Sequence, residues 1–155
     1  MAGRTYRYFD GEPLYAFGHG LSYTTFKYDN ARVNRSKIKA NDEVTVSVDV
    51  TNTGKMAGDE VVQLYLSHEG VKDAPIRSLQ AFERISVAPG ARKTVEFRLR
   101  DRAFSIVDAQ GVRRVQPGRV NVWIGGGQPV TRAGVPAVAG TRTQFSLMNS
   151  AVLPL

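Results

Sequence analysis

The chain has no cysteine, and this absence removes several kinds of chemistry at once. Disulfide bonds, thiolate metal sites and a cysteine nucleophile are all excluded. The two histidines, His19 and His68, are too few for a zinc site without carboxylates, because zinc takes three or four ligands. No run approaches the ~18 apolar residues of a membrane span, and the first residues lack the apolar core of a signal peptide. The sequence therefore predicts no metal, no cofactor and no membrane partner.

Positive charge is abundant but is not concentrated in one place. The net charge is +7, with +4 in residues 1–40, −1 in residues 41–100 and +4 in residues 101–155. No basic run is longer than two residues, as in the pair Arg113 and Arg114. A surface that follows a phosphate backbone needs clustered Lys and Arg with aromatic residues between them. We therefore predict solvated strand faces and no nucleic-acid partner.

Alternating apolar and polar residues are the strongest structural pattern in the chain. In residues 43–51, Val44, Val46, Val48 and Val50 fall on one face and polar residues fall on the other. This period of two, made mostly of β-branched residues, is typical of a half-buried strand. Residues 52–55 then supply turn chemistry, with Gly54 free to adopt a positive φ there.

Similar runs predict further strands along the rest of the chain. They cover residues 59–67, 79–87, 93–100, 119–124 and 144–148, with shorter candidates at 103–107 and 112–116. In residues 79–87 the apolar side chains of Phe82, Ile85 and Val87 cannot share one face without a bulge. Residues 128–142 are expected to form a loop. Several short strands separated by Gly and Pro turns predict an all-β sandwich of two sheets.

The first 28 residues, which we call the junction segment, differ from this strand array. They contain eight of the fourteen aromatic residues, together with glycines and a proline that exclude a long regular element. So much aromatic surface should be buried, either against the chain's own sandwich or against another domain. We expect the second, with a domain interface formed by Tyr6, Tyr8, Phe9, Tyr15, Phe17, Tyr23 and Phe26.

The junction segment also opens a series of motifs that resembles a known family. Residues 14–26 read LYAFGHGLSYTTF, residues 50–54 VTNTG and residues 57–65 AGDEVVQLY. They are followed by APIRSL at 74–79, FER at 82–84, PG at 89–90, and GRV and WIGG at 118–120 and 123–126. In this order the motifs resemble the C-terminal domain of family 3 glycoside hydrolases, which include β-glucosidases and β-xylosidases.

The resemblance implies a fibronectin type III or immunoglobulin-like sandwich over residues 29–127, after a junction at 1–28 and before a loop and last strand at 128–155. It also implies that the catalytic Asp nucleophile and acid/base lie in preceding domains. The chain would then be a non-catalytic accessory domain whose partners are the catalytic domains of the same polypeptide. That parent would be secreted or periplasmic. The loops at 68–78 and 126–142 would be the ones to reach a substrate entrance.

The residues themselves offer no catalytic pair. A retaining glycosidase needs two carboxyl groups ~5–5.5 Å apart, but neighbours on a strand, such as Asp59 and Glu60, point to opposite faces. Trp123 is the one candidate for sugar contact, because the alternation turns it away from the valine face together with Tyr65. Packing of the indole is the expectation. A module that binds a β-linked oligosaccharide and a general protein-interaction module remain the alternatives.

Overall fold

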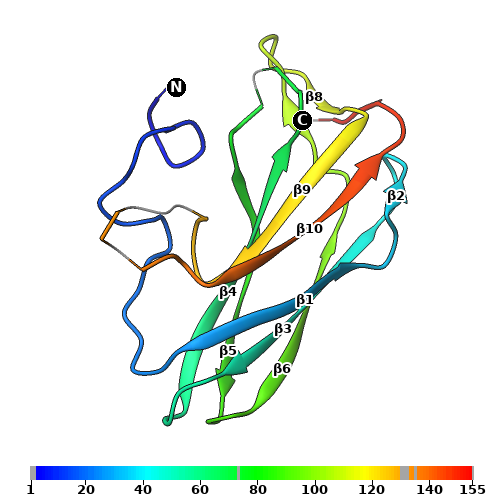
Figure 1. Cartoon of the computed structure of the whole chain (residues 1–155). Helices are drawn as coiled ribbons and strands as arrows, with labels where there is room; N and C mark the ends of the chain where they lie inside the picture. The colour runs from blue at the N-terminus through cyan, green and yellow to red at the C-terminus, as the bar shows by residue number, and fades with distance from the viewer. Residues whose placement is uncertain (1–2, 73, 130–132, 135, 155) are drawn as a thin grey trace.

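Strands dominate the molecule and meet at short turns (Figure 1). The computed structural model describes residues 3–72, 74–129, 133–134 and 136–154, and these ranges contain eleven strands and no helix. Accordingly, none of the described residues form a helix long and apolar enough to cross a membrane. The strands are β1 (Phe26–Val33), β2 (Lys37–Ile38), β3 (Val44–Asn52), β4 (Gly58–His68), β5 (Ser78–Val87), β6 (Arg92–Leu99), β7 (Ile106–Val107), β8 (Arg113–Val115), β9 (Gly118–Gly125), β10 (Gly140–Leu147) and β11 (Ala151–Val152).

Two sheets pack face to face, which confirms the predicted all-β sandwich. The first sheet has the order β1-β3-β6 and the second the order β2-β10-β9-β4-β5. All pairings are antiparallel except that of β2 with β10. A small third sheet, β11-β8-β7, lies at one end, where β7 and β8 form the hairpin between β6 and β9.

The core lies between the two sheets and is built from the alternating residues. Val44, Val46, Val48 and Val50 of β3 are fully buried, and the inward residues of β4 and β9 meet them from the other sheet. Burying one such side chain contributes about 1.5–3 kcal/mol. A shift of one residue in register would turn a whole row of valines to solvent, so the hydrophobic pattern also fixes the register.

The first strand, β1, was not predicted from the sequence, which indicated no strand before residue 43. β1 starts at Phe26, and Tyr28, which lies inside the junction segment, is a buried core residue. A register shift between Asp29 and Arg32, with Asn30 at a φ of 53°, interrupts the alternation in this strand. That irregularity removes the period of two on which the sequence analysis depends. The short strands β2 and β11 were missed because they have only two residues each.

In the edge strand β5, only two of the three apolar residues Phe82, Ile85 and Val87 lie in the core. Ile85 and Val87 are buried, whereas Phe82 lies opposite Gln63 on the outer side of the sheet and is 69% exposed. The irregularity in this strand lies at Gln80, which has no partner between the pairs Leu64–Ala81 and Tyr65–Leu79. The expected bulge therefore exists, but it does not bring Phe82 into the core. The strand β10 begins at Gly140, so the expected loop at 128–142 ends three residues early.

Candidate docking surface and sheet hollow

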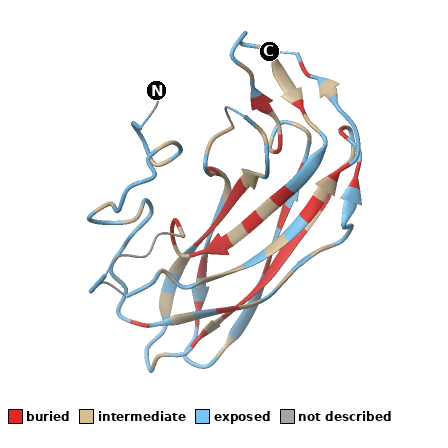
Figure 2. Cartoon of the chain, turned by 45° about the horizontal axis from the view of Figure 1, so that its top comes forward, coloured by how far each residue is buried: buried red, intermediate tan, exposed pale blue. Residues whose placement is uncertain are grey.

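The junction segment lies along the outside of the sandwich, beside the loop that joins β9 to β10 (Figure 1). Figure 2 shows that this segment is mostly exposed, whereas burial is concentrated in the strands. It is nevertheless held in place by contacts with the second sheet. Tyr6 stacks on Phe17, with ring centroids 4.3 Å apart, and meets Tyr65 of β4 edge-on at 6.2 Å. The Leu79 amide donates a hydrogen bond of 3.2 Å to the Tyr6 hydroxyl.

A second set of hydrogen bonds fixes the middle of the junction segment. The Phe17 amide donates to Gln128 Oε1 at 3.1 Å, and the Gln128 amide donates to the Phe17 carbonyl at 2.9 Å. Gln128 is only 3% exposed, so both of these bonds are shielded from water. Near the start of the junction segment, the Arg7 carbonyl accepts a hydrogen bond of 2.8 Å from the Ile76 amide. The segment is therefore a shaped part of the surface.

The end of the junction segment is locked onto the β3–β4 turn by a buried amide. Thr24 Oγ1 donates to Asn52 Oδ1 at 2.6 Å, and the Gly54 amide donates to the same oxygen at 3.0 Å. Asn52 Nδ2 in turn donates to the carbonyls of Met56 and Val87, at 2.8 and 2.9 Å. Asn52 is fully buried, and all of its polar side-chain atoms are satisfied. This lock explains why the motifs SYTTF and VTNTG occur together.

The role of Gly54 differs from the one expected from the sequence. Its φ is not positive; instead, a Cβ at this position would overlap Thr24 Oγ1 and lie 3.2 Å from the Thr25 amide nitrogen. The turn therefore needs glycine for close approach of the junction segment. The freedom of glycine to adopt a positive φ is not used at this position.

The seven aromatic residues predicted to form an interface separate into two groups. Tyr6, Tyr8 and Phe26 are half-buried, and Phe26 packs against the core. Phe9, Tyr15, Phe17 and Tyr23 are exposed. The segment thus partly wraps its own sandwich and partly faces outward. Its most exposed apolar side chains are Leu14 (70%), Tyr15 (72%), Leu21 (98%) and Tyr23 (94%).

Trp123 lies on the outer face of the second sheet in a row of paired residues. Tyr65 of β4, Trp123 of β9 and Arg142 of β10 are direct cross-strand partners. The indole lies close to Gly140, where a Cβ would be 2.7 Å from its Cε2 atom, and Nε1 donates to the Gly127 carbonyl at 2.8 Å. The Arg142 guanidinium carbon lies over the ring, 5.2 Å from the centroid.

This arrangement favours the expected packing role of Trp123. A sugar ring could stack on the indole only after Arg142 had moved, because the guanidinium already covers it. Tyr65 is only 1% exposed and so offers no sugar platform. Its burial raises the pKa of its hydroxyl, which donates to Gln63 Oε1 at 2.6 Å. Sugar stacking on this pair stays a prediction that the geometry does not favour.

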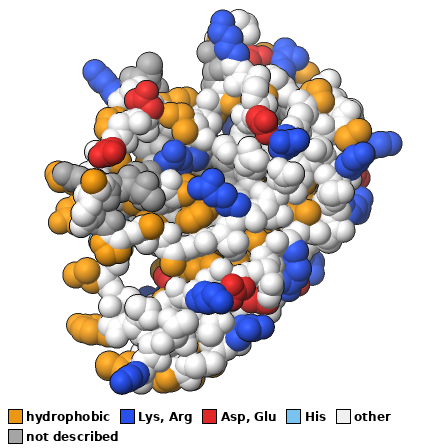
Figure 3. Space-filling model, viewed as in Figure 1, with side chains coloured by type: hydrophobic (Ala, Val, Ile, Leu, Met, Phe, Trp, Pro, Cys, Tyr) orange, Lys and Arg blue, Asp and Glu red, His pale blue; other side chains and the backbone are white. Residues whose placement is uncertain are grey.

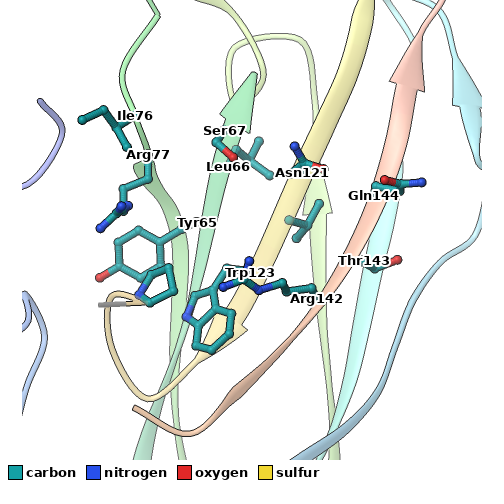
Figure 4. Close-up of a pocket in the computed structure, with 12 residues that line it drawn as sticks. Tyr65, Leu66, Ser67, Ile76, Arg77, Asn121, Trp123, Arg142, Thr143 and Gln144 are labelled. Atoms are coloured by element: carbon teal, nitrogen blue, oxygen red, sulfur yellow. The ribbon is translucent and has the colours of Figure 1, made fainter. Parts of the chain in front are cut away.

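The same row borders an open hollow of about 560 Å³ (Figure 4). Tyr65 and Trp123 form its base, and Arg77, Ile76 and Pro129 border it together with Arg142. Asn121 and Gln144, which are partners across β9 and β10, add side-chain amides at its rim. The two arginines were not predicted as site residues, because Arg77 precedes β5 and Arg142 lies on β10, and only the sheet topology brings them together.

The histidines and acidic residues form no reactive cluster in the described part of the chain. No group of three His, Cys, Asp or Glu residues there could hold a metal ion. His68, at the end of β4, is half-buried with a ring nitrogen 2.8 Å from the Phe104 carbonyl oxygen. Burial lowers the pKa of His68. His19 lies beside Tyr15, with ring centroids 5.3 Å apart.

Glu60 is the unusual carboxylate of the sandwich. It alternates with Val62 on the inward side of β4, near Tyr28 and Gly126. Burial raises its pKa, although a hydrogen bond of 3.0 Å from the Val61 amide partly opposes that shift. Burial and the nearby Glu60 charge also raise the pKa of Tyr28, whose buried hydroxyl has no hydrogen-bond partner among the described residues.

Replacing Glu60 with Gln should therefore raise the free energy of unfolding at pH 7 but not at pH 4. The folded protein holds the Glu60 proton more tightly than the unfolded chain does, so its unfavourable contribution grows as the pH rises above 4.5 and through the folded pKa. Urea unfolding of both proteins at the two pH values measures this difference. Glu83→Gln, a change at an exposed position on β5, should show no such pH dependence. An equal effect of Glu60→Gln at both pH values would contradict the argument.

Comparison with known proteins assigns the chain to a family. Residues 60–128 match the family model described as "Fibronectin type III-like domain". A β-xylosidase of Formosa agariphila is 43% identical over 77% of this chain and 17% of that protein. A periplasmic β-glucosidase of Salmonella typhimurium is 42% identical over 78% of this chain and 16% of that protein.

The solved structures agree with the sequence relatives. The structure of a β-glucosidase from Erythrobacter marinus superposes with a TM-score of 0.77 at 36% identity, covering 94% of this chain and 18% of that one. The chain thus spans less than a fifth of the length of these relatives. The resemblance seen in the ordered motifs is confirmed: the chain belongs to the family 3 β-glucosidases and β-xylosidases, of which it represents the fibronectin type III-like part.

Proposed function

We propose that this chain is an accessory domain that docks onto the catalytic domains of a β-glucosidase or β-xylosidase and stabilises them. The observation that carries this proposal is the set of exposed apolar residues on an anchored segment: Leu14, Tyr15, Leu21 and Tyr23. An apolar patch of this kind is typical of a protein interface. Figure 3 shows hydrophobic side chains along the side of the molecule where the junction segment lies.

The shape of the junction segment supports a docking role. Its backbone is held by Gln128 on one side and by the Thr24–Asn52 lock on the other, with the exposed residues between or beside these points. A segment that is already ordered loses little conformational entropy when a partner covers it. Contacts of a partner with Leu21 and Tyr23 should therefore strengthen docking without the entropic cost of first ordering the segment.

The relatives supply the partner and the class of substrate for this proposal. They are named β-xylosidases and β-glucosidases, and they are several times longer than this chain. We place the reaction in the remainder of such a polypeptide, with a β-linked glycoside as substrate. The loops at 68–78 and 126–142 would lie nearest to a substrate entrance. A secreted or periplasmic location would match the Salmonella relative, which is named as periplasmic.

The double substitution Leu21→Ser with Tyr23→Ser tests the docking surface. In the full-length parent protein, it should lower the midpoint of thermal inactivation, because two large apolar contacts are lost at the interface. When the chain is added in trans to the remaining domains, the affinity should fall by about tenfold or more. Calorimetry and a hydrolysis assay on aryl β-xyloside and aryl β-glucoside measure both effects.

Val152→Ser is the matched control for this experiment. Val152 is also an exposed apolar residue (61%), but it lies on β11 in the small third sheet, away from the Leu21 region (Figure 1). It should leave affinity and thermal inactivation unchanged. If the double variant behaves like this control, the junction segment is not the docking surface. Turnover by the 155-residue chain alone would instead require a catalytic pair among its own carboxylates.

A further inference from the structure

Two arginines converge on the hollow of the second sheet from distant parts of the sequence. Arg142 reaches it from β10 and lies over Trp123, whereas Arg77 reaches it from the residue before β5. In Figure 4, Arg77 points toward the Tyr65 ring, and the Arg142 side chain extends toward Trp123. Burial and the charge of Arg142 both lower the pKa of Arg77.

Nothing in the described part of the chain neutralises this pair. Seven ion pairs join described residues, and none of them includes Arg77 or Arg142. The other described residues that line the hollow are uncharged. Two like charges at the mouth of a partly apolar hollow repel each other and favour the approach of an anion.

The lining indicates which anion fits. A guanidinium binds a carboxylate through two parallel N–H···O bonds, and two guanidiniums on one hollow can hold both of its oxygens. Ile76 and Pro129 provide apolar walls for the carbon skeleton that carries the acid. Asn121 and Gln144 provide amides that can donate to and accept from hydroxyl groups. The volume of about 560 Å³ leaves room for more than a bare ion.

We propose that this hollow is a binding site for a carboxylate group, held by Arg77 and Arg142 above the Tyr65–Trp123 base. The carboxylate belongs either to a free sugar acid or to an acidic side chain. The site lies on the outer face of β4, β9 and β10 and does not require the docking function proposed above. Its test can therefore succeed or fail independently of that function.

Titration of the 155-residue chain at low ionic strength tests the site. The probes are glucuronate, N-acetylglutamate amide, neutral glucose and inorganic phosphate, with binding measured by calorimetry and by the fluorescence of Trp123, the single tryptophan. We expect saturable binding of a carboxylate at or below roughly 10 mM and weaker binding in high salt. Arg77→Gln and Arg142→Gln should each weaken it by about tenfold, and Arg142→Lys by less, because lysine keeps the charge but loses the fork.

Arg98→Gln is the control, because it removes the same charge from an exposed position on β6 in the other sheet. It should leave carboxylate binding unchanged, and circular dichroism should show that all variants keep the strand content. Glucuronate bound about tenfold tighter than the glutamate derivative identifies a sugar acid as the ligand. Equal binding of the two identifies the carboxylate of an acidic side chain. The proposal is overturned if neither carboxylate binds, if glucose or phosphate binds as tightly, or if Arg98→Gln weakens binding as much as Arg77→Gln.

Discussion

Asn52→Ala should lower the free energy of unfolding of this chain by about 3 kcal/mol. The side-chain amide of Asn52 is fully buried and makes four hydrogen bonds, to Thr24, Gly54, Met56 and Val87. Alanine would leave two donors and two carbonyls without that partner, and the bonds to the Thr24 hydroxyl and the Val87 carbonyl are the buried ones. Each unsatisfied buried group costs about 1–3 kcal/mol before relaxation. Urea unfolding followed by circular dichroism measures the loss.

Asn34→Ala supplies the comparison for that experiment. Asn34 Oδ1 accepts one hydrogen bond of 2.9 Å from the Thr45 amide, but at an exposed position where water can replace it. Its loss should amount to less than about 1 kcal/mol. If the Asn52 variant loses no more stability than the Asn34 variant, the buried amide does not hold the turn. A second consequence is local: in the Asn52 variant, proteolysis should reach the junction segment before the strands, because Thr24 is released.

Gly140→Ala should destabilise the sandwich by about 2 kcal/mol and change the emission of Trp123. The added methyl group would overlap the indole at Cζ2 and lie 2.7 Å from both Cε2 and Cη2. The indole is also held by its bond to the Gly127 carbonyl, so it can move only by breaking that bond. The hollow above it should change shape, and any binding that depends on Arg142 should weaken in parallel.

Gly20→Ala is the matched substitution for Gly140→Ala. A Cβ at Gly20 would meet no atom within 4 Å, and its φ is not positive. The free energy of unfolding should stay within about 0.5 kcal/mol of the wild-type value, and the fluorescence should not change. Equal stability of the two alanine variants would mean that Trp123 does not depend on the glycine beneath it.

The sequence predicted the sandwich well wherever one face of a strand is apolar. β3, β4, β6 and β9 follow the period of two, because the buried face accepts only apolar side chains. β1 was not predicted, because Asn30 and the register shift beside it break that period. The periodicity of a strand does not indicate which distant segments contact each other, and the hydrogen bond between Thr24 and Asn52 is such a contact.

The candidate sites were predictable to different degrees. The aromatic content of the junction segment indicated that it contacts another surface, but it could not show which rings face the sandwich. Tyr6, for example, is covered because it stacks on Phe17. Trp123 was found by its position in the alternation. Arg77 and Arg142 carried no signal, since single arginines are common on exposed strand ends and only the folded sheet makes them neighbours.

The outer edge of β5 has a consequence for aggregation of the isolated domain. A free edge strand can add a strand from a second molecule, and natural proteins oppose this with bulges and with charges that point inward. β5 has both features: Gln80 interrupts its pairing, and Glu83, exposed, faces the same side as the buried Ile85. Growth of fibrils by edge-to-edge addition is therefore discouraged, so copies of this domain that stick together should do so through side chains rather than through shared backbone hydrogen bonds.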